Sequence, residues 1–276
     1  MTTRSIETGT DELLCEVTDH VATITMNRPE KRNALGDQMT PALREILLAT
    51  ETDPDVRVVV LTGSGEAFCA GGDVSGMGDN LGGGNTAGRS IDDMVRGLQH
   101  AQESVSLRLF DFAKPTIAAL PGAAAGAGMS IALACDLRIA ADSAVLVPAF
   151  GRIGLSGDFG GSWLLSRHIG PGRAKEVYFT GRRIDATEAQ ALGLFNRVVP
   201  FADLREQTAE LAGQLAQNAP IALRYMKENH NRAMTADLKT TMAMEADRMV
   251  RCMHTEDHKQ AVQAFFAKTK PEFKGR

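Results

Sequence analysis

The sequence is poor in aromatic residues and cysteine, has no long apolar run, and carries little net charge. Its 276 residues include one tryptophan, two tyrosines and four cysteines, and the formal net charge is −4 at pH 7. This charge gives no reason to expect nucleic acid or an anionic membrane surface as a partner. No stretch approaches the ~20 apolar residues of a membrane span. The composition is that of an ordinary globular protein, long enough for one large domain.

The cysteines and histidines form no metal motif and no redox pair. The cysteines are far apart in the sequence, at Cys15, Cys69, Cys135 and Cys252. We interpret them as reduced thiols of a cytosolic protein. The first residues contain no apolar run long enough for a signal peptide, so we expect a cytoplasmic location. No metal ligand is predicted.

Patterning divides the chain into an α/β core over residues 1–200 and a helical region over 201–276. In the core, periodicity and turn residues predict the following elements. They are a β-hairpin over 12–18 and 21–26, a helix over 37–50, a strand over 56–61, a helix over 91–112, a strand over 116–120, a buried helix over 123–134, and strands over 136–140 and 143–147. Residues 74–90 contain six glycines and are interpreted as a mobile loop near the substrate.

In the helical region, the spacing of apolar residues predicts helices over 201–217, 220–233, 236–253 and 256–268. A tail rich in methionine and alanine suits a contact between subunits, and it suits a cap on the core equally well.

Two glycine-bearing turns are candidates for chemistry. The first spans Phe68 to Asp73, and the second, Gly126-Ala127-Gly128, lies at the start of a predicted helix. Backbone N–H groups at a helix N-terminus lack partners and lie at the positive end of the helix dipole. Two such groups aimed at one point would form an oxyanion hole. Taken singly, each turn has the simpler interpretation of a tight turn.

Five motifs in this order and spacing resemble the enoyl-CoA hydratase/isomerase (crotonase) superfamily, from about residue 12 to the C-terminus. They are Asn27 to Leu35, Phe68 to Asp73, Pro121 to Asp136, Gly154 to Gly161, and Phe179-Thr180-Gly181. The resemblance implies a spiral of ββα units with a helical C-terminal trimerisation region. It also implies a homotrimer or a dimer of trimers. It specifies the reaction much less closely, because one fold can host many reactions.

The resemblance also implies the binding mode of an acyl-coenzyme A thioester. The N–H groups of Gly72 and Ala127 would hold the thioester oxygen, Ala70 would contact the substrate, and Asp73 would be structural. The locally basic segment that contains Arg28, Lys31 and Arg32 would lie near the CoA phosphates. A solvated turn is the alternative for these basic residues. CoA would be part of the substrate, and no separate cofactor is expected.

The sequence departs from the hydratase pattern at two positions. The resemblance places the two glutamates of typical hydratases at Ser130 and Phe150, both of which would contact the substrate here. Neither side chain titrates usefully, so a two-carboxylate mechanism is not expected.

One carboxylate remains at a suitable position. Asp158 resembles the aspartate of dienoyl-CoA isomerases and of the epoxide-to-oxepin isomerase of phenylacetate catabolism. Phe150 and Phe159 would remove water from it and raise its pKa, which suits a general base. The alternative is that Asp158 caps a helix that starts near Gly160.

Three functions remain open from the sequence. A single carboxylate favours double-bond isomerisation of an enoyl-CoA, with Asp158 as acid and base. A true enoyl-CoA hydratase of fatty-acid or related acyl-CoA degradation would use Asp158 with Ser130 placing the water. A catalytically silent acyl-CoA binding protein would have kept the fold and lost the glutamates.

Overall fold

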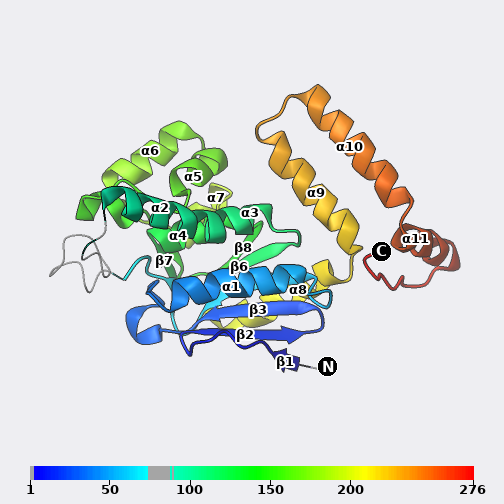
Figure 1. The fold of residues 1–276 in the computed structure, drawn as a ribbon, viewed down its shortest axis with the longest axis horizontal. Coiled ribbons are helices and arrows are strands. Elements are labelled where there is room, and N and C mark those ends of the chain that lie inside the picture. Colours follow the sequence, from blue (N-terminus) through cyan, green and yellow to red (C-terminus); the bar gives the residue numbers. More distant parts are fainter. Residues whose placement is uncertain (1–2, 74–87, 89) are drawn as a thin grey trace.

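The protein is an α/β body from which the helices near the C-terminus project (Figure 1). This computed structural model describes residues 3–73, 88 and 90–276. The glycine-rich segment 74–90 therefore lies outside the described residues, apart from residues 88 and 90. None of the described helices has the length and apolar character of a membrane span.

The larger sheet has the strand order β1-β2-β3-β4-β6-β8-β11. Its strands are β1 (Thr3–Ser5), β2 (Leu13–Thr18), β3 (Val21–Met26), β4 (Val58–Gly63), β6 (Thr116–Leu120), β8 (Leu137–Ala141) and β11 (Arg197–Val199). The first three strands pair antiparallel, which confirms the predicted hairpin, and the later strands pair parallel. Parallel strands are usually covered on both faces, and this arrangement places the sheet at the centre of the body.

Both faces of the larger sheet are buried, as the alternation of side chains in β4 shows. Val59 and Leu61 face the main core, which also contains residues of α1 (Met39–Thr52). Val58 and Val60 face a second apolar cluster, whose cover is α8 (Leu204–Ala216). Successive strand residues point to opposite faces, so one apolar run supplies both cores.

The smaller sheet has the order β10-β9-β7-β5 and lies beside the larger one. Its strands are β5 (Ala67–Cys69), β7 (Ala123–Ala125), β9 (Val145–Val147) and β10 (Ile184–Asp185). Strands β4, β6 and β8 of the larger sheet are each followed by a strand of the smaller one and then by a helix. The resulting units are β4-β5-α2, β6-β7-α4 and β8-β9-α5, which confirms the expected spiral of ββα units.

The segment 123–134 differs from its prediction. A continuous buried helix was expected, but residues 123–125 form strand β7 and the helix α4 is Ala127–Ala134. Gly126 separates them with φ 52° and ψ −123°. The three alanines carry no strand period, and they become a strand because they pair in parallel with β5 and β9.

The remaining helices of the body cover the smaller sheet and the main core (Figure 1). A π-helical turn (Glu103–Leu107) joins α2 (Ile91–Gln102) to α3 (Arg108–Asp111), as one continuous segment near the predicted bounds. The others are the 3-10 turns Pro29–Lys31, Ala149–Ile153 and Phe201–Asp203, and the helices α5 (Gly161–Ile169), α6 (Pro171–Thr180) and α7 (Ala186–Ala191).

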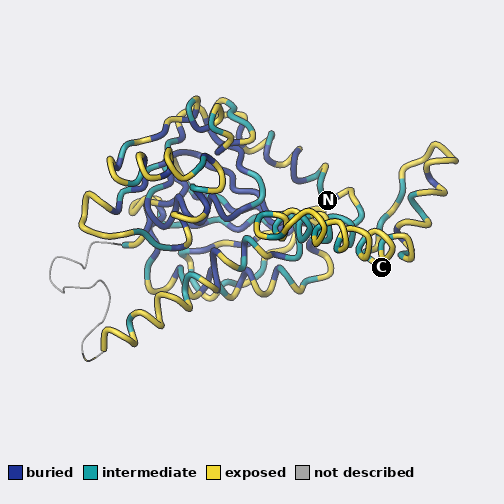
Figure 2. The backbone as a smooth tube through the Cα atoms, turned by 90° about the horizontal axis from the view of Figure 1, so that it is seen from above, coloured by how far each residue is buried: buried dark blue, intermediate teal, exposed yellow. Residues whose placement is uncertain are grey.

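The last three helices leave the body and carry mostly exposed or half-buried residues (Figure 2). They are α9 (Pro220–Ala233), α10 (Leu238–Met253) and α11 (Glu256–Ala267), close to the predicted bounds. The Nζ atom of Lys227 on α9 lies 2.8 Å from a carboxylate oxygen of Asp136 and so ties the helix to the body. Because α8 packs on the larger sheet, the projecting part begins after residue 216. The division of the chain at residue 200 stays a prediction.

Candidate active site

The first glycine turn presents the N–H group of Gly72 away from its neighbouring strand. Leu35 donates its N–H to the Gly71 oxygen at 2.7 Å, and Asp73 donates to the Leu35 oxygen at 2.8 Å. In this parallel bridge the residue between the two bonded ones, Gly72, directs its N–H to the other side. Within the described part of the chain, this N–H group donates to no other residue. It is therefore available to a ligand.

The second turn presents the N–H group of Ala127, the first residue of α4. A first-turn N–H group has no partner inside its helix, and it lies at the positive end of the helix dipole. No described residue accepts from it. Gly126 before it has a backbone conformation that side-chain-bearing residues rarely adopt, so glycine is required at this position.

Glycines bring the two turns into contact. A Cβ atom on Gly71 would lie 3.4 Å from the Ala127 nitrogen and 2.8 Å from the Ala125 oxygen. A Cβ atom on Gly128 would lie 2.4 Å from the Cys69 oxygen. Only residues without side chains allow this approach. The turns after β5 and β7 thus place Gly72 and Ala127 at the same end of the smaller sheet, as an oxyanion hole requires.

Arg28 is held inside the protein by three partners. Its guanidinium lies 3.2 Å from a Glu12 carboxylate oxygen and 3.1 Å from an Asp73 carboxylate oxygen. It also donates to the Ala34 oxygen at 3.0 Å. These contacts fasten the Asn27–Asn33 segment to the first glycine turn, which gives Arg28 and Asp73 a structural role. Contact between Arg28 and a CoA phosphate stays a prediction and would compete with these partners.

Arg32 lines a groove that leads to the glycine turns. The inner part of the groove has a volume of about 400 Å³ and is lined by small apolar side chains, by Ala70, and by Arg32 and Arg183. The Ala70 N–H donates to the Arg32 oxygen at 2.9 Å, which fixes the two segments side by side. Lys31 is exposed beside them and forms no ion pair with any described residue.

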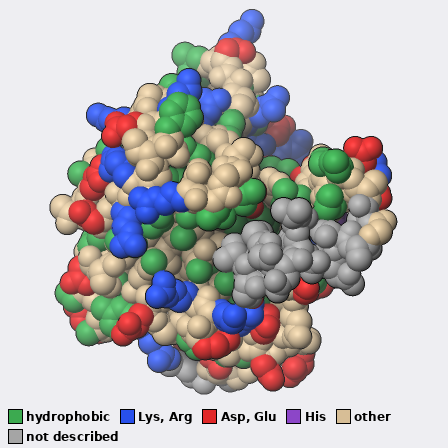
Figure 3. Space-filling view, turned by 90° about the vertical axis from the view of Figure 1, so that its left-hand side faces the viewer, with side chains coloured by type: hydrophobic (Ala, Val, Ile, Leu, Met, Phe, Trp, Pro, Cys, Tyr) green, Lys and Arg blue, Asp and Glu red, His purple; other side chains and the backbone are tan. Residues whose placement is uncertain are grey.

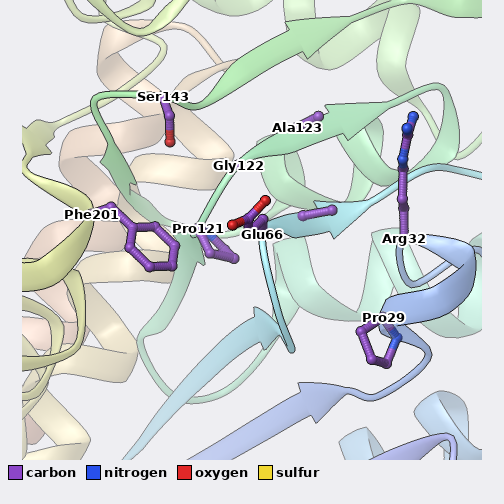
Figure 4. Close-up of a pocket in the computed structure, with 9 residues that line it drawn as sticks. Pro29, Arg32, Glu66, Pro121, Gly122, Ala123, Ser143 and Phe201 are labelled. Carbon is purple, nitrogen blue, oxygen red and sulfur yellow. The ribbon is translucent and has the colours of Figure 1, made fainter.

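The outer part of the groove has a volume of about 700 Å³ and shares Arg32 with the inner part. Figure 4 shows Arg32 on one side of this hollow, Phe201 and Ser143 on the other, and Glu66 between them. Figure 3 shows lysine and arginine side chains gathered next to exposed apolar ones on one face of the molecule. Arg32 and Arg183 beside small apolar walls suit an elongated anionic ligand in the inner part, while the Glu66 carboxylate offsets part of this positive charge in the outer part.

Asp158 is the residue that the sequence predicts to be the acid and base. Burial raises its pKa from the usual 3.8 to about 6. Its Oδ1 atom is buried and has no hydrogen-bond partner among the described residues. The residue at the N-cap of α5 is Gly160, and no side chain caps that helix. The capping role considered for Asp158 is therefore wrong, and its carboxylate is not used by the fold in this way.

Ser130 and Phe150, where the sequence resemblance places the two hydratase glutamates, lie close to the loop that carries Asp158. The Ser130 hydroxyl is fully buried and donates to the backbone oxygen of Asp158 at 3.0 Å. Phe150 is also buried, and its ring lies 3.5 Å from the point where a Cβ atom on Gly126 would be. Neither residue supplies a carboxylate, so no second acid or base comes from these two positions.

An apolar hollow of about 340 Å³ begins at Phe159, next to Asp158, and lies between the π-helical turn and α5. Its lining includes Leu107, Phe110 and Trp163. It contains one buried polar atom without a hydrogen-bond partner in the described chain, the hydroxyl oxygen of Ser106. A π-helical turn often marks a functional position in a helix.

Sequence reasoning missed three residues of the site. Arg183 lies two residues after the Phe179-Thr180-Gly181 motif, and the pair Arg182-Arg183 was a signal of basic character. Ser106 carried no signal, because a serine inside a helical pattern is unremarkable. Tyr178 carried no signal either, yet its hydroxyl is buried without a hydrogen-bond partner among the described residues. In the same part of the chain, no cluster of three or more metal-ligating side chains is present.

Comparison with known proteins agrees with this architecture. The family model described as enoyl-CoA hydratase/isomerase matches residues 16–276. A short-chain-enoyl-CoA hydratase of Clostridium acetobutylicum is 36% identical over 268 residues, covering 96% of this chain and 99% of that protein. A 1,2-epoxyphenylacetyl-CoA isomerase of Escherichia coli strain K12 is also 36% identical, over 265 residues, covering 96% of this chain and 98% of that protein.

Solved structures give the same result. The crystal structure of an enoyl-CoA hydratase from Polaromonas sp. JS666 has a TM-score of 0.87 at 36% identity, covering 95% of this chain and 99% of that one. The ββα units and the C-terminal helices are thus those of the crotonase class of enzymes. The chain belongs to the enoyl-CoA hydratase/isomerase family and is an acyl-CoA enzyme.

Proposed function

We propose that the enzyme binds an enoyl-CoA thioester along the groove and holds its thioester oxygen between the N–H groups of Gly72 and Ala127. Both groups lack partners in the described structure and meet at one end of the smaller sheet. Negative charge develops on that oxygen when an α-proton is lost. Two preorganised donors stabilise it, and removal of one such donor typically costs about 3–4 kcal/mol of transition-state stabilisation.

The nucleotide end of CoA would occupy the outer groove, with its phosphates near the junction with the inner part. Arg32 lines both parts and Arg183 lines the inner one, so both supply positive charge near this junction, although the chain as a whole is acidic. Ala70 and the small side chains of the inner groove leave room for the narrow pantetheine arm. In this assignment Arg28 holds the glycine turn in place and Arg32 contacts phosphate.

The reaction that we propose is double-bond isomerisation, with Asp158 as the acid and base. The observation that carries it is a single carboxylate, largely buried and with one oxygen atom unpaired among the described residues, while serine and phenylalanine stand at the two expected glutamate positions. Its ionised form takes a proton from one acyl carbon, and the C–H electron pair enters the thioester enolate. The protonated form then returns the proton to a carbon two atoms away, and the double bond shifts.

The acyl chain would extend from Asp158 into the apolar hollow beyond Phe159. The walls of that hollow favour an apolar acyl group. A polar substituent on the acyl chain that forms a hydrogen bond with the unpaired Ser106 hydroxyl would bind more tightly.

Hydration is the second candidate, because two of the three relatives and structures described above are hydratases by name. It would need a group to activate water and another to protonate carbon. The Ser130 hydroxyl donates its proton to a backbone oxygen in this structure, so it could serve a water molecule only as an acceptor.

Incubation with a panel of enoyl-CoA thioesters in deuterated water, analysed by mass spectrometry, tests the proposal. Isomerisation predicts exchange of carbon-bound hydrogen for deuterium without a gain of water. Hydration predicts products heavier by one water molecule, and that result would replace isomerisation as the activity. If no thioester is changed, the interpretation that remains is a catalytically silent acyl-CoA binding protein.

A further inference from the structure

Tyr178 lies near the end of α6 with its hydroxyl group buried and without a hydrogen-bond partner among the described residues. Buried hydroxyl groups nearly always have a partner, so an orphaned one requires an explanation. The Oδ1 atom of Asp158 is orphaned in the same sense. One of these groups is a donor and the other an acceptor.

The chain around Asp158 is folded tightly onto the Tyr178 ring. A Cβ atom on Gly161 would lie 2.4 Å from the Tyr178 hydroxyl and 2.2 Å from the Ser130 hydroxyl. A Cβ atom on Gly157 would lie 3.1 Å from the Cε1 atom of Tyr178. Glycines on both sides of Asp158 therefore allow the loop to approach the phenol closely.

The Ser130 hydroxyl is the other polar group beside the phenol. It donates its own proton to the Asp158 backbone oxygen, but its lone pairs can accept from the phenol, so it competes with the carboxylate for that proton. An ionised carboxylate is the stronger acceptor of the two. Phe150 stacks on the Tyr178 ring, with the ring centres 6.0 Å apart and the planes 12° from parallel, and offers no acceptor. Burial raises the pKa of Tyr178 to about 12; the neighbouring Ser130 hydroxyl acts against this rise and the charge of Asp158 adds to it. The phenol thus remains a donor at all physiological pH values.

We propose that Tyr178 is a positioning residue whose phenol donates a hydrogen bond, directly or through one water molecule, to the ionised carboxylate of Asp158. The proposal deepens the function proposed above and rests on it for the role of Asp158. A donor to the charged form favours ionisation and so counteracts burial. It also fixes the orientation of the carboxylate toward the acyl carbons. Such catalytic contacts are often long before substrate binds and shorten in the complex.

The elements packed around Asp158 supply no competing charge. Ser130 on α4, Phe150 on the turn Ala149–Ile153, and Phe159 in the same loop are neutral. Burial is the cause of the raised pKa of Asp158, and no charged side chain of the described residues adds to it. A change in the titration of Asp158 on removal of the phenol hydroxyl would therefore report on that hydroxyl.

The substitution Tyr178→Phe tests the proposal, because it removes the hydroxyl and keeps the ring that stacks on Phe150. Tyr225→Phe is the matched control, since Tyr225 lies on α9 under Arg224 and away from the site. The free protein, labelled with carbon-13 at its aspartate carboxyl groups, is titrated by NMR, and Asp158→Asn assigns the signal. We expect Tyr178→Phe to move the midpoint of Asp158 upward by roughly 1–2 pH units, the worth of one hydrogen bond to a charged group. Tyr225→Phe should leave it unchanged.

Kinetics provide the second measurement, with an enoyl-CoA that the wild type converts. The base must be ionised, so the acid limb of the kcat/KM profile should move to higher pH in Tyr178→Phe, with kcat reduced and KM retained. If the NMR titration of Asp158 and the pH profile of kcat/KM in Tyr178→Phe both match the wild type, the proposal is overturned, and the role of Tyr178 is limited to packing. A protein that converts no enoyl-CoA would count against the proposed function, while the NMR titration would still decide the role of Tyr178.

Discussion

The Ser130 hydroxyl donates a hydrogen bond to the backbone oxygen of Asp158 at 3.0 Å, across 28 residues of sequence. A residue at the position of a hydratase glutamate therefore holds the loop that carries the remaining carboxylate. The Gly161 N–H donates to the same oxygen at 3.1 Å. The backbone of Asp158 is thus fixed from two elements, while its Oδ1 atom remains unpaired within the described structure.

Asp158→Asn should abolish most of the activity without unfolding the protein. The amide keeps the shape of the side chain and cannot accept a proton as a base. We expect kcat to fall by roughly 10²–10⁴-fold, the usual worth of a positioned general base. The affinity for CoA thioesters should change little. Steady-state kinetics and calorimetry provide the measurements.

The control for this variant is Asp19→Asn in the exposed hairpin turn. Asp19 has a positive φ of 49°, which asparagine tolerates well, so this change should leave kcat unaffected. Turnover by Asp158→Asn within a few fold of the wild type would rule out Asp158 as the base.

Gly128→Ala should damage the oxyanion hole and the fold together. Its Cβ atom would lie 2.4 Å from the Cys69 oxygen, a backbone atom that cannot move alone. We expect a loss of about 1–3 kcal/mol in the free energy of unfolding, the usual cost of overpacking, and a reduced kcat. The matched control is Gly172→Ala in α6, where a Cβ atom meets nothing within 4 Å. Urea denaturation should show Gly172→Ala at least as stable as the wild type, and equal losses in both variants would contradict the close approach.

Arg32→Ala and Arg183→Ala should each weaken the binding of acyl-CoA. Both side chains line the inner groove, and the phosphates are the part of the ligand that they would contact. Binding of the acyl-pantetheine, which has no nucleotide, should be weak and unaffected by either change. The acyl-CoA affinity of the wild type should fall as salt is added, and less so in the variants. Arg251→Ala on α10 is the control, and calorimetry in which it matched the other two would refute the assignment of the groove.

The stability of the protein in acid should depend on two groups that act in opposite directions. The folded protein holds Asp158 at a pKa of about 6 instead of 3.8, so its free energy of unfolding falls as pH rises through this window. It holds His168 at a pKa of about 4 instead of 6.5, mainly because of burial, so the free energy of unfolding falls as pH drops from 6.5 to 4. In the wild type these two effects partly cancel.

Asp158→Asn should uncover the contribution of His168. The variant should be more stable than the wild type at about pH 8, by on the order of 1–2 kcal/mol once partial exposure is allowed for. It should lose stability more steeply on acidification. Urea midpoints measured between about pH 8 and pH 4 test this, with Asp19→Asn as the reference. Parallel curves for the variant and the wild type would show that Asp158 is not desolvated.

We expect the protein to assemble as a trimer or a dimer of trimers through its projecting helices. These helices expose large apolar side chains, including Met242 and Met249 on α10 and Phe265 and Phe266 on α11. Such side chains are usually covered by another chain. Light scattering at micromolar concentration should give a multiple of three chains. A monomer mass would contradict the prediction, and Met249→Glu should lower the mass if these helices form the contact.

The sequence predicted the elements whose patterns are strong and local. The hairpin, α1, β4, β6 and the C-terminal helices all lie within a few residues of their predicted bounds, because periodicity and turn residues mark them. The short strands β5, β7 and β10 were not found. Two or three residues carry no period, and their extended form depends on pairing within the smaller sheet.

The site was predictable from the sequence where the backbone conformation or close packing requires glycine. Gly71, Gly126 and Gly128 marked the two turns, since a Cβ atom at position 71 or 128 would collide with neighbouring backbone and the positive φ of Gly126 disfavours other residues. The partners of Arg28 could not be foreseen, because Glu12 and Asp73 reach it from distant segments. The same holds for the Tyr178 hydroxyl, whose isolation appears only when Gly157 and Gly161 fold around it.

The parallel pairing of β5 with β7 has a consequence for folding cooperativity. Gly72 follows one of these strands and Ala127 follows the other, so the position of one N–H group relative to the other depends on the pairing of these two strands. Any partially unfolded form in which these strands separate loses the site, even if the larger sheet remains intact. Catalytic activity is therefore a direct reporter of opening in the smaller sheet. During denaturation it should disappear before the far-ultraviolet signal of the helices does.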